Sequence, residues 1–294
     1  ADDIATDFEL WCIDDPDGRL RTKFNACSTE PTYRSGRFAE GYYATDHFGD
    51  PMTLHSFGNR HYVLGCRLER VVWPYFVKFF IFASSLRQRQ LFLKAAAVVM
   101  DQAGVLILGR GSGGKTTFVQ EICGNGGLVL SNSHAIVKGT LVTGVRTTMR
   151  VRQKAERNAH LGGVASPLRD GEILVDPFEQ APPGAPDTAE LRAAFIIDFR
   201  NRRDEGSRLL APADAAAFAA RFSLGVSVYG LEEEMLELVD HDVVRFAEVE
   251  RRLGSDLQEL FRKIPCAVVR TDILLPGALQ RAIETVGLAK GFNS

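Results

Sequence analysis

A glycine-rich run between two apolar segments carries the most specific chemical pattern in the sequence. Residues 109–116, GRGSGGKT, match the spacing G-x-x-x-x-G-K-[S/T], which is typical of loops that bind nucleotide phosphates. Glycines let backbone N–H groups turn inward around phosphate oxygens, because side chains would block that approach and several positions require unusual dihedral angles. The pattern therefore predicts a phosphate-binding loop (P-loop) over Gly109–Thr117, between a strand and a helix.

Two side chains of this loop are expected to take part in the chemistry directly. Lys115 supplies a mobile ammonium group to the β and γ phosphates, and the hydroxyl of Thr116 binds Mg²⁺. The helix that starts there adds the partial positive charge of its N-terminus. The residues expected to contact the nucleotide are Gly109, Arg110, Gly111, Ser112, Gly113, Gly114, Lys115, Thr116 and Thr117.

A carboxylate at the end of a buried strand is expected to complete the metal site. Asp198 follows the apolar run 195–197, and Asp176 follows the apolar run 173–175. An aspartate that merely caps a strand end at the surface has the same pattern, so the sequence leaves both roles open for each residue. We take Asp198 as the predicted metal ligand.

The elements that position the loop follow from hydrophobic patterning. Residues 95–100 and 105–108 are apolar runs with a short turn between them, which predicts two adjacent strands. The glycine cluster at 124–127 ends the next helix, and residues 128–130 form a short strand. The apolar side of that helix consists of Phe118, Val119 and Ile122.

The remaining elements are predicted from periodicity and from helix-start signals. Pro74 opens a helix, because proline suits the first helical turn. Ser255 and Gln258 form a capping box that separates two helices, the first with Val243 and Leu253 on its apolar face. Further predictions are short strands within 8–13 and 62–66, a mobile lid over 146–187 with a loop at 181–186, strands at 191–199 and 267–269, and helices at 212–222 and 277–286.

Composition limits the possible partners. The chain of 294 residues has a formal charge of −2, so no global field favours nucleic acid or an anionic membrane surface. No run of eighteen apolar residues occurs, and the acidic N-terminus lacks the features of an export signal. Five cysteines without a C-x-x-C pair are typical of reduced thiols. We expect a cytoplasmic protein that binds neither nucleic acid nor membrane, and the sequence leaves a homo-oligomer open.

The region around the loop resembles the HPr kinase/phosphorylase-like family, whose nucleotide site is shared with phosphoenolpyruvate carboxykinase. The similar stretches are residues 93–99 and 104–108, the loop, and residues 128–134, in the order strand, turn, strand, loop, helix, strand, catalytic segment. The resemblance implies an α/β fold with a P-loop kinase core, a mixed sheet flanked by helices, over 91–294. Residues 1–90 lie outside it and are expected to form an additional α+β region for substrate or partner binding.

The sequence departs from the family at two places that bear on catalysis. Lys94 stands where the family usually has a histidine, and Asn132-Ser133 stands where it has an aspartate pair. The carbonyl of Asn132 can still bind Mg²⁺, but it cannot take a proton from a hydroxyl. His134 is the candidate replacement base, since on an extended segment it faces the same side as Asn132. An ordinary polar contact at a strand end is the alternative role.

A basic series follows this segment and supplies the last predicted catalytic residue. Arg146, Arg150, Arg152 and Lys154 lie at even spacing, which puts them on one side of an extended segment. Such a row binds phosphate or an acidic substrate, and we take Arg152 as its catalytic member. The alternative is a solvated charged face.

Three functions are compatible with these residues. The first is an ATP-dependent, Mg²⁺-dependent phosphotransferase acting on a hydroxyl of a small molecule, peptide or protein. The second is a nucleotide-binding sensor or scaffold that keeps the loop and has lost the aspartate pair. The third is an NTPase that couples hydrolysis to movement, for which the sequence offers no further motif. ATP and GTP are not distinguished.

Overall fold

The chain has a mixed α/β fold that forms two compact units. The computed structural model describes residues 8–20, 22–23, 53–66, 68, 72–111, 113–152, 163–165, 171–179, 185–198 and 206–288. One unit contains residues 1–84 and 231–243, and the other contains residues 85–230 and 244–294. The expected domains, 1–90 and 91–294, stay a prediction, because compactness does not test independent folding.

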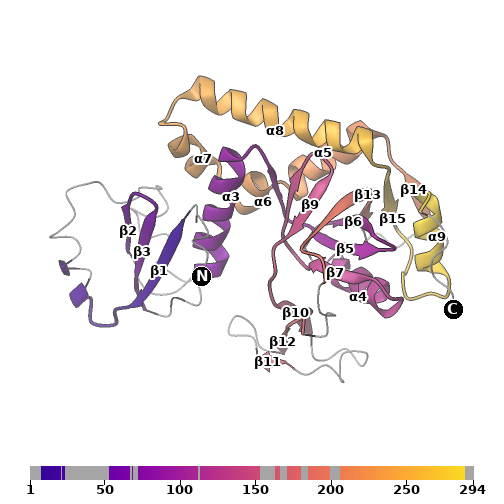
Figure 1. Ribbon diagram of the computed structural model, residues 1–294, viewed down its shortest axis with the longest axis horizontal. Coiled ribbons are helices and arrows are strands. Elements are labelled where there is room, and N and C mark those ends of the chain that lie inside the picture. Colours follow the sequence, from indigo (N-terminus) through magenta and orange to yellow (C-terminus); the bar gives the residue numbers. More distant parts are fainter. Residues whose placement is uncertain are drawn as a thin grey trace. The chain divides into compact units, whose positions relative to one another are not determined.

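A mixed sheet forms the centre of the larger unit (Figure 1). Nine described strands build it, with β4-β8-β9-β13-β6-β5-β7 in order, β15 beside β13, and β14 beside β15. β6, β13 and β15 are mutually parallel, whereas β5 is antiparallel to both β6 and β7. The strands are β4 (Leu91–Leu93), β5 (Ala96–Met100), β6 (Ala103–Leu108), β7 (Leu128–Ser131), β8 (Ala135–Lys138), β9 (Leu141–Gly144), β13 (Thr188–Ile197), β14 (Ser207–Leu209) and β15 (Cys266–Val269).

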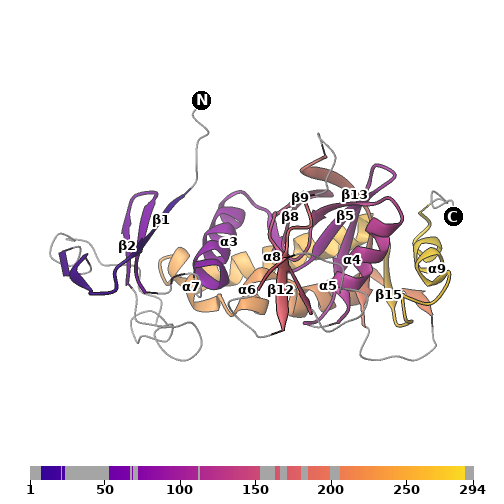
Figure 2. The same cartoon turned by 90° about the horizontal axis from the view of Figure 1, so that it is seen from below.

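Helices flank this sheet on both faces, which confirms the predicted α/β layering. Apolar residues of α4 and α9 share one buried cluster with alternate residues of β5, β6, β13 and β15. The helices α5 and α8 lie on the opposite side of the sheet from α4 (Figure 1), and Figure 2 shows α4 from below with α8 behind the sheet. The helices are α4 (Lys115–Gly124), α5 (Pro212–Phe222), α6 (Gly225–Tyr229), α8 (Val243–Lys263) and α9 (Ala278–Thr285).

The hairpin before the glycine-rich loop has the predicted form. Ala96 of β5 pairs with Ile107 of β6, and Met100 pairs with Ala103 at the turn end. The two connecting residues, Asp101 and Gln102, have φ of 47° and 64°. Such left-handed conformations at both positions match the twist of a tight hairpin. The hairpin therefore holds the start of the loop in line with a fully buried strand.

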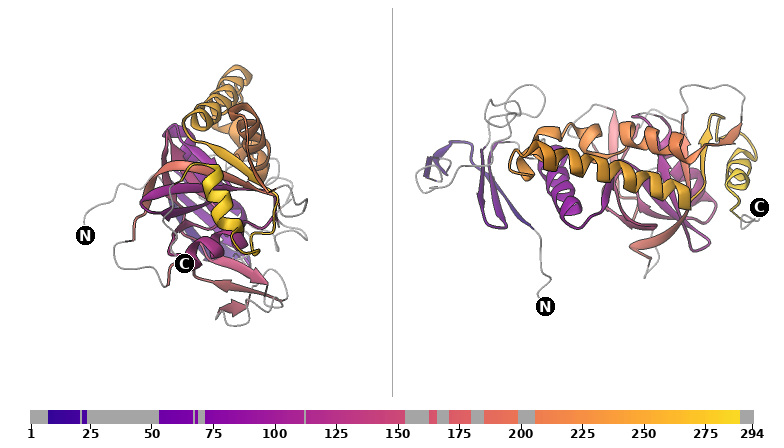
Figure 3. Two further views of the ribbon diagram at one scale, coloured as in Figure 1. Left: turned by 90° about the vertical axis from the view of Figure 1, so that its right-hand side faces the viewer. Right: turned by 90° about the horizontal axis from the view of Figure 1, so that it is seen from above.

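The prediction of two helices separated at Ser255 is wrong. Residues 243–263 form one continuous helix, α8 (Figure 3). Its buried stripe, Leu253, Leu257, Leu260 and Phe261, runs through the expected break. Val243, expected on the apolar face, is 72% exposed. Among the described residues, no helix is long and apolar enough to cross a membrane.

A small three-stranded sheet lies in the region predicted to be a lid. It has the order β10-β12-β11 and projects away from the nine-stranded sheet (Figures 1 and 3). Its strands are β10 (Met149–Arg152), β11 (Val164–Ala165) and β12 (Glu172–Val175). Residues 153–162, 166–170 and 180–184 lie outside the described part, so the structure describes only part of the predicted lid and little of the predicted 181–186 loop. The mobility of the lid stays a prediction.

The smaller unit combines a three-stranded sheet with helical segments. β1 (Glu9–Asp14) is parallel to β3 (Arg60–Gly65), which is antiparallel to β2 (Thr53–Phe57). The rings of Phe8, His61 and Phe80 pack together, with the His61 and Phe80 centroids 4.3 Å apart. Helix α7 (Glu232–Leu238) contributes the buried Glu234, which accepts a 3.0 Å hydrogen bond from the Tyr75 hydroxyl.

The helix predicted to open at Pro74 begins two residues earlier, with the π-helical segment Val72–Val77, and continues as α3 (Lys78–Arg87). The predicted strands 8–13 and 62–66 correspond to β1 and β3.

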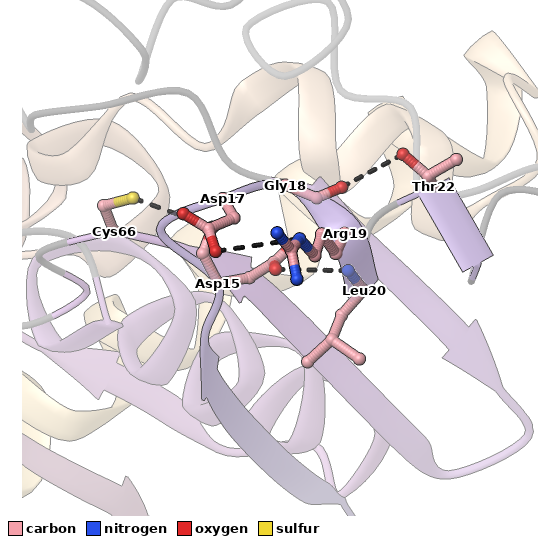
Figure 4. A network of polar contacts seen from close by, with 7 residues as sticks. All are labelled: Asp15, Asp17, Gly18, Arg19, Leu20, Thr22 and Cys66. Atoms are coloured by element: carbon pink, nitrogen blue, oxygen red, sulfur yellow. Dashed lines mark hydrogen bonds and ion pairs between the residues drawn. The ribbon is translucent and has the colours of Figure 1, made fainter.

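Hydrogen bonds and an ion pair hold the chain in place just after β1 (Figure 4). The buried Asp15 accepts the N–H of Leu20 on its side chain at 3.1 Å and the thiol of Cys66 on its carbonyl at 3.7 Å. Arg19 and Asp17 are exposed and form an ion pair, with 3.8 Å between Nε of Arg19 and Oδ2 of Asp17. The four described cysteines, Cys12, Cys66, Cys123 and Cys266, are free thiols, as the sequence predicts.

Candidate functional site

Several strand ends meet at one edge of the main sheet, where the glycine-rich loop begins. β13 is parallel to β6, and Ile196 pairs with Leu108, the last residue of β6. β5 is antiparallel to β6, so its beginning lies at the same edge. β7 also ends there, since it is antiparallel to β5 and Ser131 pairs with Ala97. The chain therefore brings Gly109, Asp198, Lys94 and the segment after Ser131 to one edge.

The loop between β6 and α4 has no room for a Cβ at two described glycines. Gly109 has a φ of 150°, and a Cβ there would stand 2.7 Å from the carbonyl oxygen of Ile197. A Cβ on Gly113 would stand 2.9 Å from the carbonyl oxygen of Arg110 and 3.1 Å from that of Ile197. The end of β13 therefore packs directly on the loop. Gly111 is exposed with open space around it, and Ser112 lies outside the described residues.

Lys115 folds its side chain back over the loop. Its ammonium group donates to the carbonyl oxygens of Gly109 at 2.7 Å and Arg110 at 3.1 Å. Burial, and to a smaller extent the positive charge of Lys94, lower the pKa of Lys115 to about 8. Because both effects disfavour the ammonium form, an anion at this place would restore it.

Helix α4 begins at Lys115, within the glycine-rich loop motif. Gly114, its N-cap, has φ 100° and ψ 5°, and its carbonyl accepts the N–H of Phe118 at 3.0 Å. N–H groups in the first turn of a helix have no intrahelical acceptor, and they carry partial positive charge. Thr116 is half-buried in this turn, while Thr117 is buried. The helix start therefore faces the loop with amides and a hydroxyl.

The two candidate aspartates lie in different environments. Asp198 follows β13 directly, is half-buried, and donates its N–H to the carbonyl of Val269 at 3.1 Å. Asp176 follows β12 in the small sheet, is exposed, and accepts the N–H of Phe178 on its side chain at 2.8 Å. Asp176 thus caps a local turn. Only Asp198 stands on the strand that packs against the loop.

The side chain of Asn132 is buried, and both its amide nitrogen and its amide oxygen form hydrogen bonds with Thr147. Its Nδ2 donates to the carbonyl of Thr147 at 3.1 Å, and its Oδ1 accepts the hydroxyl of Thr147 at 2.7 Å. This pair joins the end of β7 to the approach of β10. The amide therefore has a structural role in the protein as it stands.

His134 follows a bend at residues 132–133 and directly precedes β8, so residues 132–134 do not form the extended segment expected from the sequence. The hydroxyl of Ser131 donates to the carbonyl of His134 and accepts its N–H at 3.0 Å, so residues 131–134 form a closed turn. The buried imidazole stacks on Phe92, with centroids 5.9 Å apart, and tilts against Tyr229 at 5.7 Å. Its ring thus joins an aromatic cluster.

A segment that the sequence did not single out lies at this same edge. The N–H of Lys94 donates to the carbonyl of Ser223 at 2.6 Å, and Leu93 forms a β-bridge with Leu224. The Lys94 ammonium lies 5.6 Å from the centroid of the Tyr229 ring. The Arg110 guanidinium lies 5.7 Å from that of Phe222. No motif marks residues 222–229; the only signal is two aromatics around the end of an alanine-rich helix.

The residues of the predicted basic row do not share one environment. Arg146 forms an ion pair with Asp187 at 2.6 Å and lies over the ring of Phe178 at 5.2 Å. Arg152 is the last residue of β10, opposite Glu172 in the small sheet. The side chains of Arg150 and Arg152, and the whole of Lys154, lie outside the described part.

The few oxygen ligands at this edge suit Mg²⁺, which does not need a coordination sphere made up of protein side chains alone. Within the described ranges, no group of three or more His, Cys, Asp or Glu side chains could hold a metal ion. Mg²⁺ at nucleotide sites keeps several waters and takes one or two protein oxygens plus phosphate oxygens. The hydroxyl of Thr116 and the carboxylate of Asp198 are the donors of that kind here.

Comparison with models of known protein families gives no match, and comparison with curated protein sequences gives none either.

Proposed function

We propose that the protein binds ATP with Mg²⁺ at this sheet edge and transfers the γ-phosphoryl group to a hydroxyl, as the HPr kinase/phosphorylase-like resemblance implies. The observation that carries the proposal is the position of Lys115. It opens α4, reaches back to the carbonyls of Gly109 and Arg110, and lies beside the strand that leads to Asp198. Loops of this sequence and setting bind β and γ phosphates in nucleotide enzymes.

The roles follow from the chemistry of each group. Loop amides and the start of α4 bind phosphate oxygens, and Lys115 adds a full positive charge. Thr116 and Asp198 hold Mg²⁺ through oxygen atoms. The acceptor oxygen forms the new bond to phosphorus, the bond to the bridging oxygen of ADP breaks, and the hydroxyl proton passes to water or to His134, the proposed base. Arg152 is proposed to neutralise charge on the transferred group.

A nucleotide-binding titration tests the proposal most directly. We expect Mg-ATP to bind the wild-type protein saturably and to bind Lys115→Ala about thirtyfold or more weakly, because a charged partner is lost from a partly buried site. Lys138→Ala is the matched control, since this exposed lysine ends β8 away from the loop. Equal affinity in all three proteins would reject the site.

A second candidate is a nucleotide-binding sensor or scaffold with little turnover. The observation that favours it is the double hydrogen bond between Asn132 and Thr147, which occupies the amide at the place where the family has an aspartate. Turnover of ATP in the presence of hydroxyl-bearing acceptors separates the two. Tight binding without turnover supports the sensor.

A further inference from the structure

We propose that the larger unit holds a second ligand site, a cavity between α8 and β4 that binds a free α-amino acid through Arg89 and Asp256. The site is separate from the phosphate-binding loop, since no residue of that loop lines the cavity. Two opposite charges line this cavity, and no ion pair joins them within the described part of the chain.

The cavity has a volume of about 130 Å³ and lies where the second half of α8 passes the start of β4. Leu91, Val137 and Leu260 form its apolar side, and all three are almost fully buried. Leu91 of β4 pairs with Val137 of β8, so this side is a fixed part of the main sheet. The other end of β4 leads to Lys94 and the loop hairpin, so the cavity lies away from the phosphate site.

The charged residues at the cavity are only partly paired with one another. Glu259 and Lys263 form an ion pair at 2.8 Å. Among the residues that the structure describes, the guanidinium of Arg89 and the carboxylate of Asp256 form no hydrogen bond or ion pair. The two groups are nevertheless close enough for the charge of Arg89 to act on Asp256. One cation and one anion are therefore available to a ligand.

Asp256 is placed to bind a cationic group. Burial raises the pKa of its carboxyl group, and the charges of Arg252 and Arg89 oppose this shift. A half-buried carboxylate has lost part of its hydration, so an ammonium group that donates hydrogen bonds to it restores what water no longer supplies. Arg252 instead donates to the carbonyl of Leu86 at 3.5 Å, which joins α8 to the end of α3.

Arg89 is held at the cavity by an unusual turn at the end of α3. Its N–H donates to the carbonyl of Leu86 at 3.3 Å, and the N–H of Gln90 donates to that of Ser85 at 2.8 Å. These two bonds define a Schellman motif, whose left-handed residue is usually glycine. Arg89 occupies that position with φ 55°, which costs free energy for a residue with a Cβ. Glycine would suit the turn better, which indicates that the arginine side chain serves something other than the turn.

The charges and the size of the cavity favour a small zwitterion. Its carboxylate can accept two parallel N–H bonds from Arg89, and its ammonium group can donate to Asp256. An α-amino acid carries these two charges at the shortest separation, which suits two groups that act on each other. Its side chain would lie against Leu91, Val137 and Leu260, which favours a short apolar one. A simple anion such as phosphate would satisfy only Arg89.

Calorimetric titration of the full chain with L-alanine and L-valine tests the site. Two derivatives of the tighter ligand serve as chemical controls: the amide lacks the carboxylate, and the N-acetyl form lacks the ammonium group. We expect saturable binding of the amino acid and at least about tenfold weaker binding of each derivative, because each loses charge-assisted hydrogen bonds. Lys115→Ala should bind the amino acid as the wild type does, since the phosphate-binding loop is a different site.

Arg89→Gly removes the guanidinium and leaves a residue that suits the turn. We expect at least about a tenfold loss of amino-acid affinity together with a melting temperature no lower than that of the wild type. Asp256→Asn should lose affinity to a similar extent. Glu250→Gln is the matched control, because Glu250 is an exposed carboxylate of α8 outside the cavity, and its affinity should equal that of the wild type.

Four outcomes would overturn the inference. These are no saturable binding of either amino acid, equal affinity for the amino acid and one of its derivatives, unchanged affinity in Arg89→Gly, and an equal loss in Glu250→Gln and Asp256→Asn. A lower melting temperature in Arg89→Gly would show that the arginine stabilises the turn, and would remove the reason to assign it to a ligand.

Discussion

The carbonyl oxygen of Ile197 lies 2.7 Å from the point that a Cβ atom on Gly109 would occupy. Gly109 also has a φ of 150°, which L side chains rarely adopt. We therefore expect Gly109→Ala to destabilise the protein by about 1–3 kcal/mol, because it adds backbone strain and a contact with backbone atoms that cannot move easily. Urea unfolding measures this loss.

Gly111→Ala is the matched control for this prediction. Gly111 has no heavy atom within 4 Å of its Cβ position and no positive φ. We expect its free energy of unfolding to stay within about 0.5 kcal/mol of the wild type. Equal losses in the two variants would mean that the loop does not pack on β13 as described.

A pair of aspartate substitutions tests the assignment of the metal ligand. Asp198→Asn removes a carboxylate beside the loop, and we expect the Mg²⁺ concentration that half-saturates ATP binding to rise about tenfold, because Mg²⁺ prefers charged oxygen ligands. Asp176→Asn makes the same change on the small sheet and keeps an oxygen to cap Phe178. It should leave the Mg²⁺ dependence as it is. A larger effect in Asp176→Asn would reverse the assignment.

The surroundings of the loop could be predicted from the sequence because their signals are local. Apolar runs around Asp101 and Gln102 predict a hairpin, and the spacing of Phe118 and Ile122 predicts the buried face of α4. At Ser255 the capping signal was misleading. The apolar spacing from Leu253 to Leu257 continues through it, and tertiary burial keeps the helix intact despite a weak propensity at Gly254.

The segment 222–229 could not be predicted in the same way. Its contacts with Lys94 and Arg110 join residues more than a hundred positions apart, and nothing in the periodicity of α5 or α6 indicates them. The sequence analysis chose Asp198 over Asp176 as the metal ligand, but it could not place either residue relative to the loop. Both follow apolar runs, but only strand pairing shows which run lies beside the loop.

The buried amide of Asn132 makes its conversion to the acid costly for stability. Asn132→Asp loses the donor to the Thr147 carbonyl and sets a carboxylate oxygen against it. We expect a loss of about 1–3 kcal/mol at neutral pH. Burial raises the pKa of the new carboxyl group, so the loss is largest above that pKa and shrinks as the pH falls and the group is protonated. Thermal unfolding between pH 5 and 8 measures this dependence.

The same substitution separates the two candidate functions. An aspartate at this position can bind Mg²⁺ and accept a proton, so we expect Asn132→Asp to turn over ATP faster than the wild type despite its lower stability. Thr147→Val is the control: it removes the hydroxyl bond to Asn132 without adding a base. Equal turnover in Asn132→Asp and the wild type, measured below the unfolding range, would contradict a catalytic role for this position.

The pKa of Lys115 predicts how the proposed nucleotide binding depends on pH. In the protein without nucleotide this pKa is about 8, because burial and the charge of Lys94 disfavour the ammonium form. Phosphates favour that form and raise the pKa. Below pH 7 the lysine is protonated with or without nucleotide, so binding takes up no proton there. Above pH 8 binding must restore the proton, and affinity falls by up to about tenfold per pH unit until the raised pKa is reached.

Calorimetry in buffers of different ionisation enthalpy measures the proton taken up when Mg-ATP binds. We expect almost no proton uptake at pH 7 and the uptake of close to one proton at pH 9. Lys94→Met removes one cause of the low pKa and should move the onset of uptake to higher pH. Lys115→Arg should show no uptake at either pH, since a guanidinium stays charged throughout. Uptake at pH 9 that persists in Lys115→Arg would assign the proton to another group and remove this support for the phosphate site.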